Sequence, residues 1–178
     1  ASSAHRVSDG WTYGFPEYNA LQSEKIANSL RITNPGCYAI ASVSMLYPLV
    51  VSKILPYDFP ITINAISGYS GGGRQMISTF EDNTNPEFTH EVFHVYGLSL
   101  EHKHIPEIQK YSGLAVRPLF VPRVGRFRQG MVVQIPLQLC MIPGKPRPRD
   151  VQSTLQDHYE GCPLVTVLPF DETKTISK

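Results

Sequence analysis

The chain has 178 residues, a length that suits one domain and allows a buried core. Hydrophobic residues make up 42% and charged residues 17%, a composition typical of globular proteins and not of disordered ones. Because the formal net charge is only +1, the composition argues against a dominant electrostatic role in binding nucleic acid or an anionic membrane.

No apolar run approaches the roughly 18–20 residues that a membrane-spanning helix needs. The three cysteines, Cys37, Cys140 and Cys162, cannot form a closed disulfide framework, and their spacing matches no zinc motif. We therefore expect a reducing, cytoplasmic compartment and no metal. The sequence opens with Ala1 rather than Met and stops soon after an apolar segment, which favours a domain excised from a longer protein.

The opening segment, Ala1–Asn19, is rich in turn-forming and aromatic residues and is interpreted as an ordered loop. Periodicity and turn signals predict these elements in chain order: a helix over Ala20–Leu30, a helix over Cys37–Ile54, a strand over Pro60–Ile66, a glycine-rich loop over Ser67–Arg74, a helix from Gln75–Phe80, a strand over Glu91–Leu100, a helix over Pro106–Tyr111, strands over Leu119–Pro122 and Met131–Leu139, a basic loop over Pro143–Arg149, a helix over Val151–Tyr159 and a strand over Pro163–Leu168. Strands and helices do not alternate regularly. The pattern therefore favours an α+β fold with a mixed, largely antiparallel sheet and helices on one face.

Cys37 is the strongest candidate for a reactive residue, because it follows the turn Asn34-Pro35-Gly36 and precedes a predicted helix. At a helix N-terminus, unpaired backbone N–H groups and the helix dipole stabilise a thiolate, the nucleophilic form of cysteine. The same N–H groups could hold a developing oxyanion. The alternative is a buried structural cysteine, since free cysteines are commonly buried. Cys140 and Cys162 lack this context and are interpreted as structural.

His102 and His104 form a second candidate site, since residues at i and i+2 share one face of a strand. Either histidine could act as a general base near neutral pH. The alternative is a polar strand end with one hydrogen-bonded histidine. A metal site is less favoured, because no motif in the sequence supplies the further ligands that two imidazoles would need.

The glycine-rich loop Ser67–Arg74 forms a third candidate site, where glycines let the backbone approach a ligand. Arg74 or a serine hydroxyl of this loop could bind a carboxylate or a phosphate, but the alternative is a plain flexible turn. The loop is neither a phosphate-binding P-loop nor a GxGxxG fingerprint. Further candidate anion contacts are Arg6 and Tyr13 in the opening segment and the cluster Arg123, Arg126 and Arg128, for which the alternative is a solvated face.

Three motifs in this order carry a resemblance to a known family: Asn34-Pro35-Gly36-Cys37-Tyr38, Ser67-Gly68-Tyr69-Ser70-Gly71-Gly72-Gly73-Arg74 and His102-Lys103-His104-Ile105-Pro106-Glu107. They are preceded by Ser3-Ala4-His5-Arg6 and Trp11-Thr12-Tyr13-Gly14-Phe15-Pro16-Glu17. With these motifs the chain resembles the N-acetyl-gamma-glutamyl-phosphate reductases of arginine biosynthesis, in their shorter bacterial form. The resemblance covers most of the chain, through the strand predicted at Met131–Leu139.

The resemblance implies a fold like the catalytic domain of glyceraldehyde-3-phosphate and aspartate-semialdehyde dehydrogenases. It implies that residues 1–178 are a single catalytic and dimerisation domain. It also implies that NADP is bound mainly by a Rossmann domain that this chain lacks. The partners implied are a small-molecule acyl phosphate and further copies of the chain, associated through the sheet.

By the same resemblance, Cys37 would attack the acyl phosphate of N-acetyl-glutamyl 5-phosphate, and NADPH would reduce the resulting thioester to the 5-semialdehyde. One of His104 and His102 would be the acid/base and the other would bind substrate, with His104 favoured as the base. The substrate-binding residues implied are Arg6, Ser67, Ser70, Tyr96, Arg74 and Glu107, the last of which could also orient a histidine. The cofactor would contact Gly68 and Gly71.

The chain departs from the family pattern at two points. Ala39-Ile40 follows the Cys-Tyr pair, where the family usually has proline and then a hydroxyl residue. Lys103 stands between the histidines in place of the usual arginine, so the charge is kept and the bidentate geometry is lost. Two other functions remain open: a cysteine-dependent acyl hydrolase or transferase, and a non-catalytic assembly module. The isolated chain, which lacks a nucleotide-binding half, is expected to be inactive alone and not to bind NADP tightly.

Overall fold

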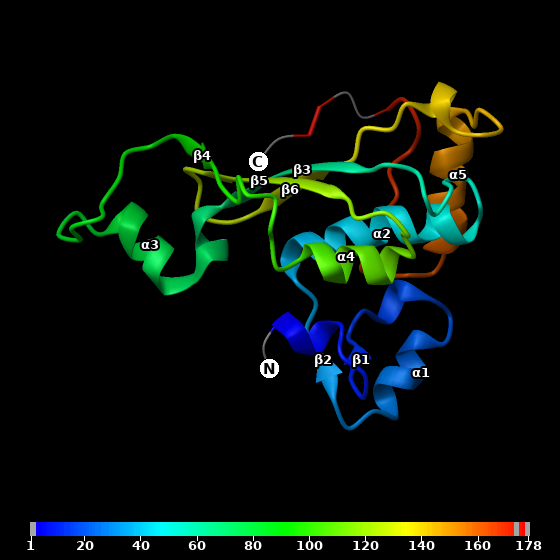
Figure 1. The fold of residues 1–178 in the computed structure, drawn as a ribbon, viewed down its shortest axis with the longest axis horizontal. Helices are drawn as coiled ribbons and strands as arrows, with labels where there is room; N and C mark the ends of the chain where they lie inside the picture. The colour runs from blue at the N-terminus through cyan, green and yellow to red at the C-terminus, as the bar shows by residue number, and fades with distance from the viewer. Residues whose placement is uncertain (1–2, 173–174, 177–178) are drawn as a thin grey trace. The chain divides into compact units, whose positions relative to one another are not determined.

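The computed structural model describes residues 3–172 and 175–176 (Figure 1). Its elements, in chain order, are the 3-10 helix η1 (Ser3–Arg6), β1 (Thr12–Tyr13), η2 (Pro16–Tyr18), α1 (Gln22–Ala27), β2 (Ile32–Thr33), α2 (Cys37–Val51), β3 (Thr62–Gly68), η3 (Tyr69–Gly72), α3 (Gly73–Glu81), β4 (Phe93–Val95), α4 (Ile105–Ser112), β5 (Leu119–Gly125), β6 (Met131–Gln134), η4 (Leu139–Met141) and α5 (Pro148–His158). None of the helices in this part of the chain is long and apolar enough to cross a membrane.

The chain divides into two compact units. The first comprises Ala1–Ile61, Lys103–Pro118 and Leu137–Ser177, and the second comprises Thr62–His102 and Leu119–Pro136. The prediction that the whole chain acts as one catalytic and dimerisation domain stays a prediction.

Helix α2 is the central element of the first unit, where it packs against α4 and α5 (Figure 1). Most of its buried residues recur every three or four positions and so form one face of a helix. The buried residues are Tyr38, Ala39, Ser42, Val43, Leu46, Pro48 and Leu49. The helix begins at Cys37, as predicted, and ends at Val51, three residues before the predicted end. Ser52 is its C-cap and donates its backbone N–H to the carbonyl of Pro48.

A second group of core residues in the first unit is largely aromatic. Tyr13, Phe15, Val43 and Tyr159 are buried together. The opening segment is therefore ordered, as predicted, because its aromatic side chains are part of the core. It contains two 3-10 turns and the short strand β1, which pairs in parallel with β2.

The strand predicted over Pro163–Leu168 is wrong, because this segment forms no strand in the structure. Its alternating apolar residues have a different role. Val165 and Val167 pack against the aromatic core cluster. Burial on one side produces the same alternation as a half-buried strand, so the pattern alone could not separate the two.

The second unit contains a four-stranded sheet in the order β4-β5-β3-β6. β3 and β5 are parallel over Thr62–Gly68 and Leu119–Gly125, whereas the two outer pairs, β4 with β5 and β3 with β6, are antiparallel. The predicted α+β class with a mixed, largely antiparallel sheet is confirmed. β5 extends past Pro122, the predicted end, because Val124 and Gly125 pair with β4 on one side and β3 on the other.

The other predicted strands are shorter than expected. β4 covers three residues, Phe93–Val95, of the predicted Glu91–Leu100, and β6 covers four, Met131–Gln134. His102 and His104 lie outside any strand, so the prediction that they share a strand face is wrong. The reason is Pro106, which occupies the first turn of α4 and starts that helix directly after His104.

The glycine-rich segment is more regular than the predicted loop. Ser67 and Gly68 end β3, the short η3 turn follows, and α3 begins at Gly73, two residues before the predicted helix start. Gly73 has a φ of +77°, a conformation that side-chain-bearing residues rarely adopt. Arg74 is exposed in the first turn of this helix.

Candidate active site

Cys37 is the first residue of α2, and its side chain is exposed. The N-cap residue Gly36 is extended, and its carbonyl accepts the Ile40 N–H at 2.8 Å. The first backbone N–H groups of the helix therefore have no acceptor within the helix and point toward the cysteine end. The predicted position of this cysteine at an accessible helix N-terminus is confirmed.

Two side chains converge on the residue that precedes Cys37. A methyl group placed on Gly36 would lie 2.5 Å from Cδ2 of His104, closer still to its Nε2, and 2.7 Å from Nη1 of Arg6. His104 and Arg6 can come this close to the backbone because residue 36 is a glycine and has no side chain. The imidazole of His104 and the guanidinium of Arg6 therefore both lie against the backbone at the start of α2.

His104 is buried, with 4% of its surface exposed, and it is the N-cap residue of α4. Its ring packs edge-on against Tyr38, with 6.0 Å between ring centroids. Tyr38 itself is buried in the first turn of α2. Packing therefore fixes the orientation of this histidine relative to the helix that carries the cysteine.

Glu107 is the most deeply buried carboxylate of the site, at 1% exposure. Its Oε1 accepts the backbone N–H of Gly36 at 2.8 Å and the hydroxyl of Tyr13 at 3.0 Å. Its Oε2 accepts Nη1–H of Arg6 at 3.4 Å. Both carboxylate oxygens are thus engaged by groups of the chain itself. A direct contact of Glu107 with substrate stays a prediction.

Arg6 is held on its other side by the turn before Cys37. Its Nε donates to the carbonyl of Asn34 at 2.9 Å, and its side chain is 22% exposed. The backbone carbonyl of Arg6 in turn accepts the Tyr111 hydroxyl at 2.7 Å. A guanidinium carries five N–H donors, so this arginine retains donors for an anion beside Cys37.

The remaining predicted site residues belong to the second unit. In its glycine turn, the N–H groups of Gly68, Tyr69 and Ser70 donate to carbonyls of the β5–β6 connection at 2.9–3.0 Å. A methyl group on Gly68 would lie 2.6 Å from two of those carbonyl oxygens, whereas one on Gly71 would meet only the Ser67 hydroxyl, at 3.6 Å. Of these two glycines, Gly71 leaves room for a ligand to approach the backbone and Gly68 does not.

Tyr96 and His102 lie together in the second unit. Their ring centroids are 5.8 Å apart, and His102 also packs edge-on against Phe120 at 4.9 Å.

The three arginines of the cluster predicted as an anion site each have a hydrogen-bond partner within the second unit. Arg123 donates to the Asn64 side chain, Arg126 to the Thr89 carbonyl and Arg128 to the Glu81 carboxylate. These partners favour the solvated-face interpretation over an anion site.

The sequence predicted the four residues that meet in the first unit, Cys37, His104, Arg6 and Glu107. It missed the role of Tyr13, which was expected as an anion contact and binds the chain's own carboxylate instead. The sequence did contain a local signal for the closeness of Glu107 to His104: Glu107 follows His104 by three residues at a helix start, and that spacing places both on one side of α4. The pairing with Tyr13 has no local signal.

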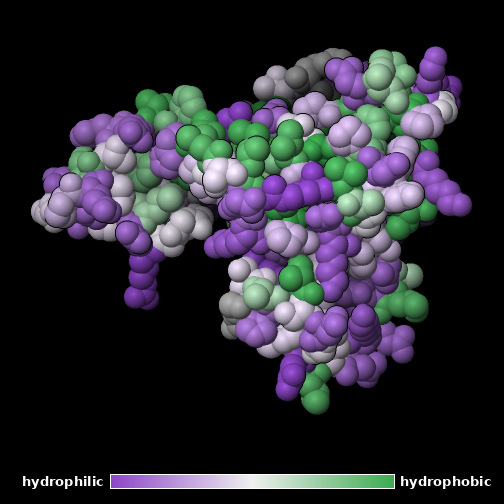
Figure 2. Space-filling model, viewed as in Figure 1, coloured by the Kyte–Doolittle hydropathy of each residue, from purple (hydrophilic) through white to green (hydrophobic). Residues whose placement is uncertain are grey.

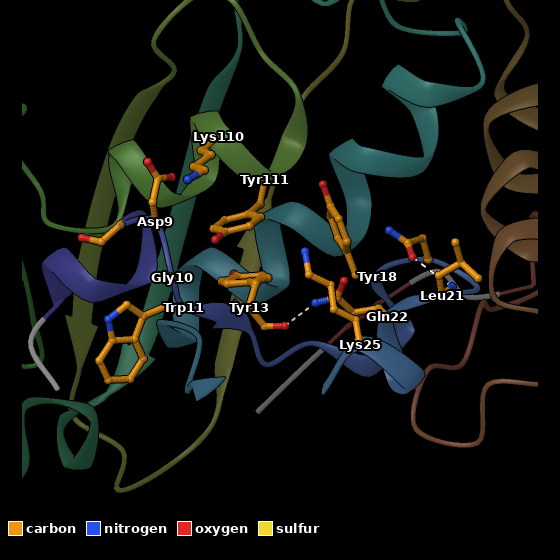
Figure 3. A pocket seen from close by; sticks show the side chains of 12 residues that line it. Asp9, Gly10, Trp11, Tyr13, Tyr18, Leu21, Gln22, Lys25, Lys110 and Tyr111 are labelled. Carbon is orange, nitrogen blue, oxygen red and sulfur yellow. Dashed lines mark hydrogen bonds between the residues drawn. The ribbon is translucent and has the colours of Figure 1, made fainter. Parts of the chain in front are cut away.

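Tyr13 also lines a pocket of about 600 Å³ (Figure 3). None of the predicted site residues except Tyr13 lines it. Its wall includes the Tyr13 and Tyr111 rings, which stack at 3.7 Å with an interplanar angle of 11°. In residues 3–172 and 175–176, no group of three or more His, Cys, Asp or Glu side chains is arranged to hold a metal ion.

The fold is α+β, and the candidate site has an exposed cysteine at a helix N-terminus with a buried histidine close by. These features are typical of a site that uses a cysteine nucleophile. The family model for the semialdehyde dehydrogenase dimerisation domain matches residues 37–178. The chain belongs to this family.

Curated relatives are similar over nearly the whole chain. An N-acetyl-gamma-glutamyl-phosphate reductase 2 of Pseudomonas putida is 45% identical over 172 residues, 97% of this chain and 54% of the relative. N-acetyl-gamma-glutamyl-phosphate reductases of Brucella anthropi and Brucella ovis are 45% and 43% identical over 177 residues, 99% of this chain and 57% of each relative. The chain thus spans about half the length of the curated relatives it matches.

Proposed function

We propose that this chain is the catalytic and dimerisation part of an NADP-dependent N-acetyl-gamma-glutamyl-phosphate reductase of arginine biosynthesis. The observation that carries the proposal is the convergence of His104 and Arg6 on the residue before the exposed Cys37. The names of the relatives supply the reaction, and the site supplies residues with the chemistry it needs.

In the proposed mechanism, the Cys37 thiolate attacks the carbonyl carbon of N-acetyl-glutamyl 5-phosphate. The C–O bond to phosphate breaks, phosphate leaves, and a thioester forms on Cys37. The first N–H groups of α2 stabilise the negative charge that develops on the carbonyl oxygen. Arg6, with donors left over, binds a carboxylate of the substrate.

NADPH, when bound, supplies the hydride that reduces the thioester. His104 would donate a proton to the oxygen of the resulting thiohemiacetal and take it back as the C–S bond breaks, which releases the 5-semialdehyde and restores the Cys37 thiolate. Among the glycines assigned to cofactor contact, Gly71 has the open backbone that a cofactor would need, and Gly68 does not. The residues of this chain therefore fit a limited part of the cofactor, which agrees with the proposal that a separate Rossmann domain binds most of it.

The sheet of the second unit supports homo-oligomerisation as part of this proposal. By register, one face of the sheet carries apolar side chains from all four strands, Phe93, Val95, Val121, Ile66 and Val132, and the polar side chains of Asn64, Arg123 and Gln134 lie among them. Phe93 is 57% exposed and Val95 37% exposed. Figure 2 shows apolar surface over these strands. Such a face suits a second copy of the same chain, and the family is named for dimerisation.

The reductase is tested by replacing the matching region of the Pseudomonas putida relative with this chain. We expect NADPH oxidation that depends on N-acetyl-glutamyl 5-phosphate, that Cys37→Ser abolishes and that Cys140→Ser, a change at another exposed cysteine, leaves intact. Phosphate release without NADPH oxidation would instead indicate a cysteine hydrolase. Activity that persists in Cys37→Ser would exclude the cysteine mechanism.

A further inference from the structure

The contacts of Glu107 differ from those expected of a residue that binds substrate. Its carboxylate is buried and receives three hydrogen bonds, from Gly36, Tyr13 and Arg6. These donors come from three separate segments: η1, β1 and the turn before α2. One side chain of α4 therefore fixes the relative positions of the cysteine turn and the arginine.

The Tyr13 phenol donates to this carboxylate from a buried position. Its ring is 3% exposed and stacks on Tyr111, as Figure 3 shows. Burial and then the nearby Glu107 carboxylate raise the pKa of Tyr13 far above its ordinary value. The phenol therefore keeps its proton, and with it the hydrogen bond to Oε1, over the whole physiological range.

Tyr111 joins the same assembly to the arginine. Its ring is the stacking partner of Tyr13, and its hydroxyl donates to the backbone carbonyl of Arg6 at 2.7 Å. The side chain of Arg6 is held by Glu107 and by the Asn34 carbonyl. Both the backbone and the guanidinium of this arginine are thus tied to groups that also hold Tyr13 or the cysteine turn.

We propose that Glu107 and Tyr13 are positioning residues: they form a buried carboxylate–phenol pair that aims the Arg6 guanidinium at the substrate anion beside Cys37. This inference rests on the proposed function. In this proposal Glu107 does not contact the substrate directly but orients Arg6, which does. Tyr13 contributes by donating a hydrogen bond to Glu107. A guanidinium aimed in this way recognises an anion without first losing side-chain conformational freedom.

The test compares two alkylating agents at Cys37, anionic iodoacetate and neutral iodoacetamide, at low salt with peptide mapping. An oriented Arg6 favours the anion, so the iodoacetate-to-iodoacetamide rate ratio at Cys37 should exceed that at exposed Cys140 by about threefold or more. Arg6→Gln should remove this excess. Glu107→Gln, in which Arg6 faces an amide, and Tyr13→Phe, which keeps the ring stack, should each remove at least half of it.

The sign of the Glu107→Gln effect separates positioning from simple charge. Removal of a negative charge alone would raise the ratio, whereas loss of Arg6 orientation lowers it. A ratio that rises in Glu107→Gln, or that is unchanged in both variants, would overturn the proposal. If Glu107→Gln does not fold, Tyr13→Phe decides, because it retains the carboxylate.

Failure of this inference is distinguishable from failure of the reductase proposal. If Cys37 supports NADPH oxidation in the chimaera but the ratio does not respond to these variants, only the positioning role is lost. If the ratio responds but Cys37 accepts no acyl group, the geometry stands and the proposed reaction is lost.

Discussion

The carboxylate of Glu107 and the backbone N–H of Gly36 meet at 2.8 Å, although 71 positions separate the two residues in the sequence. This contact connects the helix that follows His104 to the turn that precedes Cys37. This hydrogen bond, together with the packing of His104 on Tyr38, therefore places the proposed nucleophile and the proposed acid/base relative to each other.

Replacement of Gly36 by alanine should displace the two side chains that lie against this residue, His104 and Arg6. The added methyl group would overlap His104 and lie 2.7 Å from Nη1 of Arg6, so both side chains must move. We expect a loss of about 1–3 kcal/mol in the free energy of unfolding, measured by urea denaturation. Gly71→Ala is the matched control, since its methyl group would meet only the Ser67 hydroxyl at 3.6 Å, and its loss should stay within about 0.5 kcal/mol. Equal stability of the two variants would contradict the close packing at Gly36.

The stability of the chain should fall above about pH 10, the ordinary pKa of tyrosine. Burial raises the pKa of Tyr159 above that value. Above pH 10 the unfolded chain therefore loses a proton that the folded chain retains, and the free energy of unfolding decreases as the pH rises. The measurement is the urea midpoint between about pH 8 and pH 11.

The control for the alkaline prediction is Tyr159→Phe. At neutral pH it should cost about 0.5–1.5 kcal/mol, because the hydroxyl donates to the Ser44 carbonyl at 2.7 Å. Its stability should then decline less steeply than that of the parent above pH 10. Parallel curves for the two proteins would show that this phenol does not contribute to the alkaline loss.

The first turn of α5 should weaken in acid. The Asp150 carboxylate accepts the side chain and the backbone N–H of Arg147, which lowers its pKa to about 2. This contribution to stability is complete above about pH 4, the ordinary pKa of aspartate, and is lost as the pH falls toward 2. Asp150→Asn should therefore lower the urea midpoint at pH 7, and its difference from the parent should shrink through this window. A constant difference would argue against the ion pair.

A charge on the exposed sheet face should weaken self-association. Phe93→Glu places a carboxylate among the apolar side chains on the mixed face formed by β4, β5, β3 and β6. We expect the dissociation constant to rise by at least about tenfold in sedimentation equilibrium. Leu98→Glu is the matched control, because Leu98 is 79% exposed and lies outside the sheet. A parent chain that is monomeric at every concentration, or a Phe93→Glu variant that associates normally, would contradict the proposed interface.

Local signals predicted much of this fold. The turn before Cys37 and the apolar spacing after it indicated α2, and Pro106 indicated the start of α4. The cysteine, His104 and Arg6 were found in the same way, through local context or family motifs. In contrast, the hydrogen bond between Tyr13 and Glu107 joins residues 94 positions apart, and no local pattern encodes it. For Val165 and Val167, a local pattern was present but misleading. Their alternation predicted a strand, whereas in the structure it reflects packing on an aromatic cluster.

The central claim is that Cys37 accepts the acyl group. The most direct measurement is the mass of the chimaera, in which this chain replaces the matching region of the Pseudomonas putida relative, after exposure to N-acetyl-glutamyl 5-phosphate. This step needs no NADPH. We expect a single N-acetyl-glutamyl adduct that maps to Cys37, with release of one phosphate, and no adduct in Cys37→Ser. Absence of the adduct in the parent, or an adduct on Cys140 or Cys162 instead, would contradict the account.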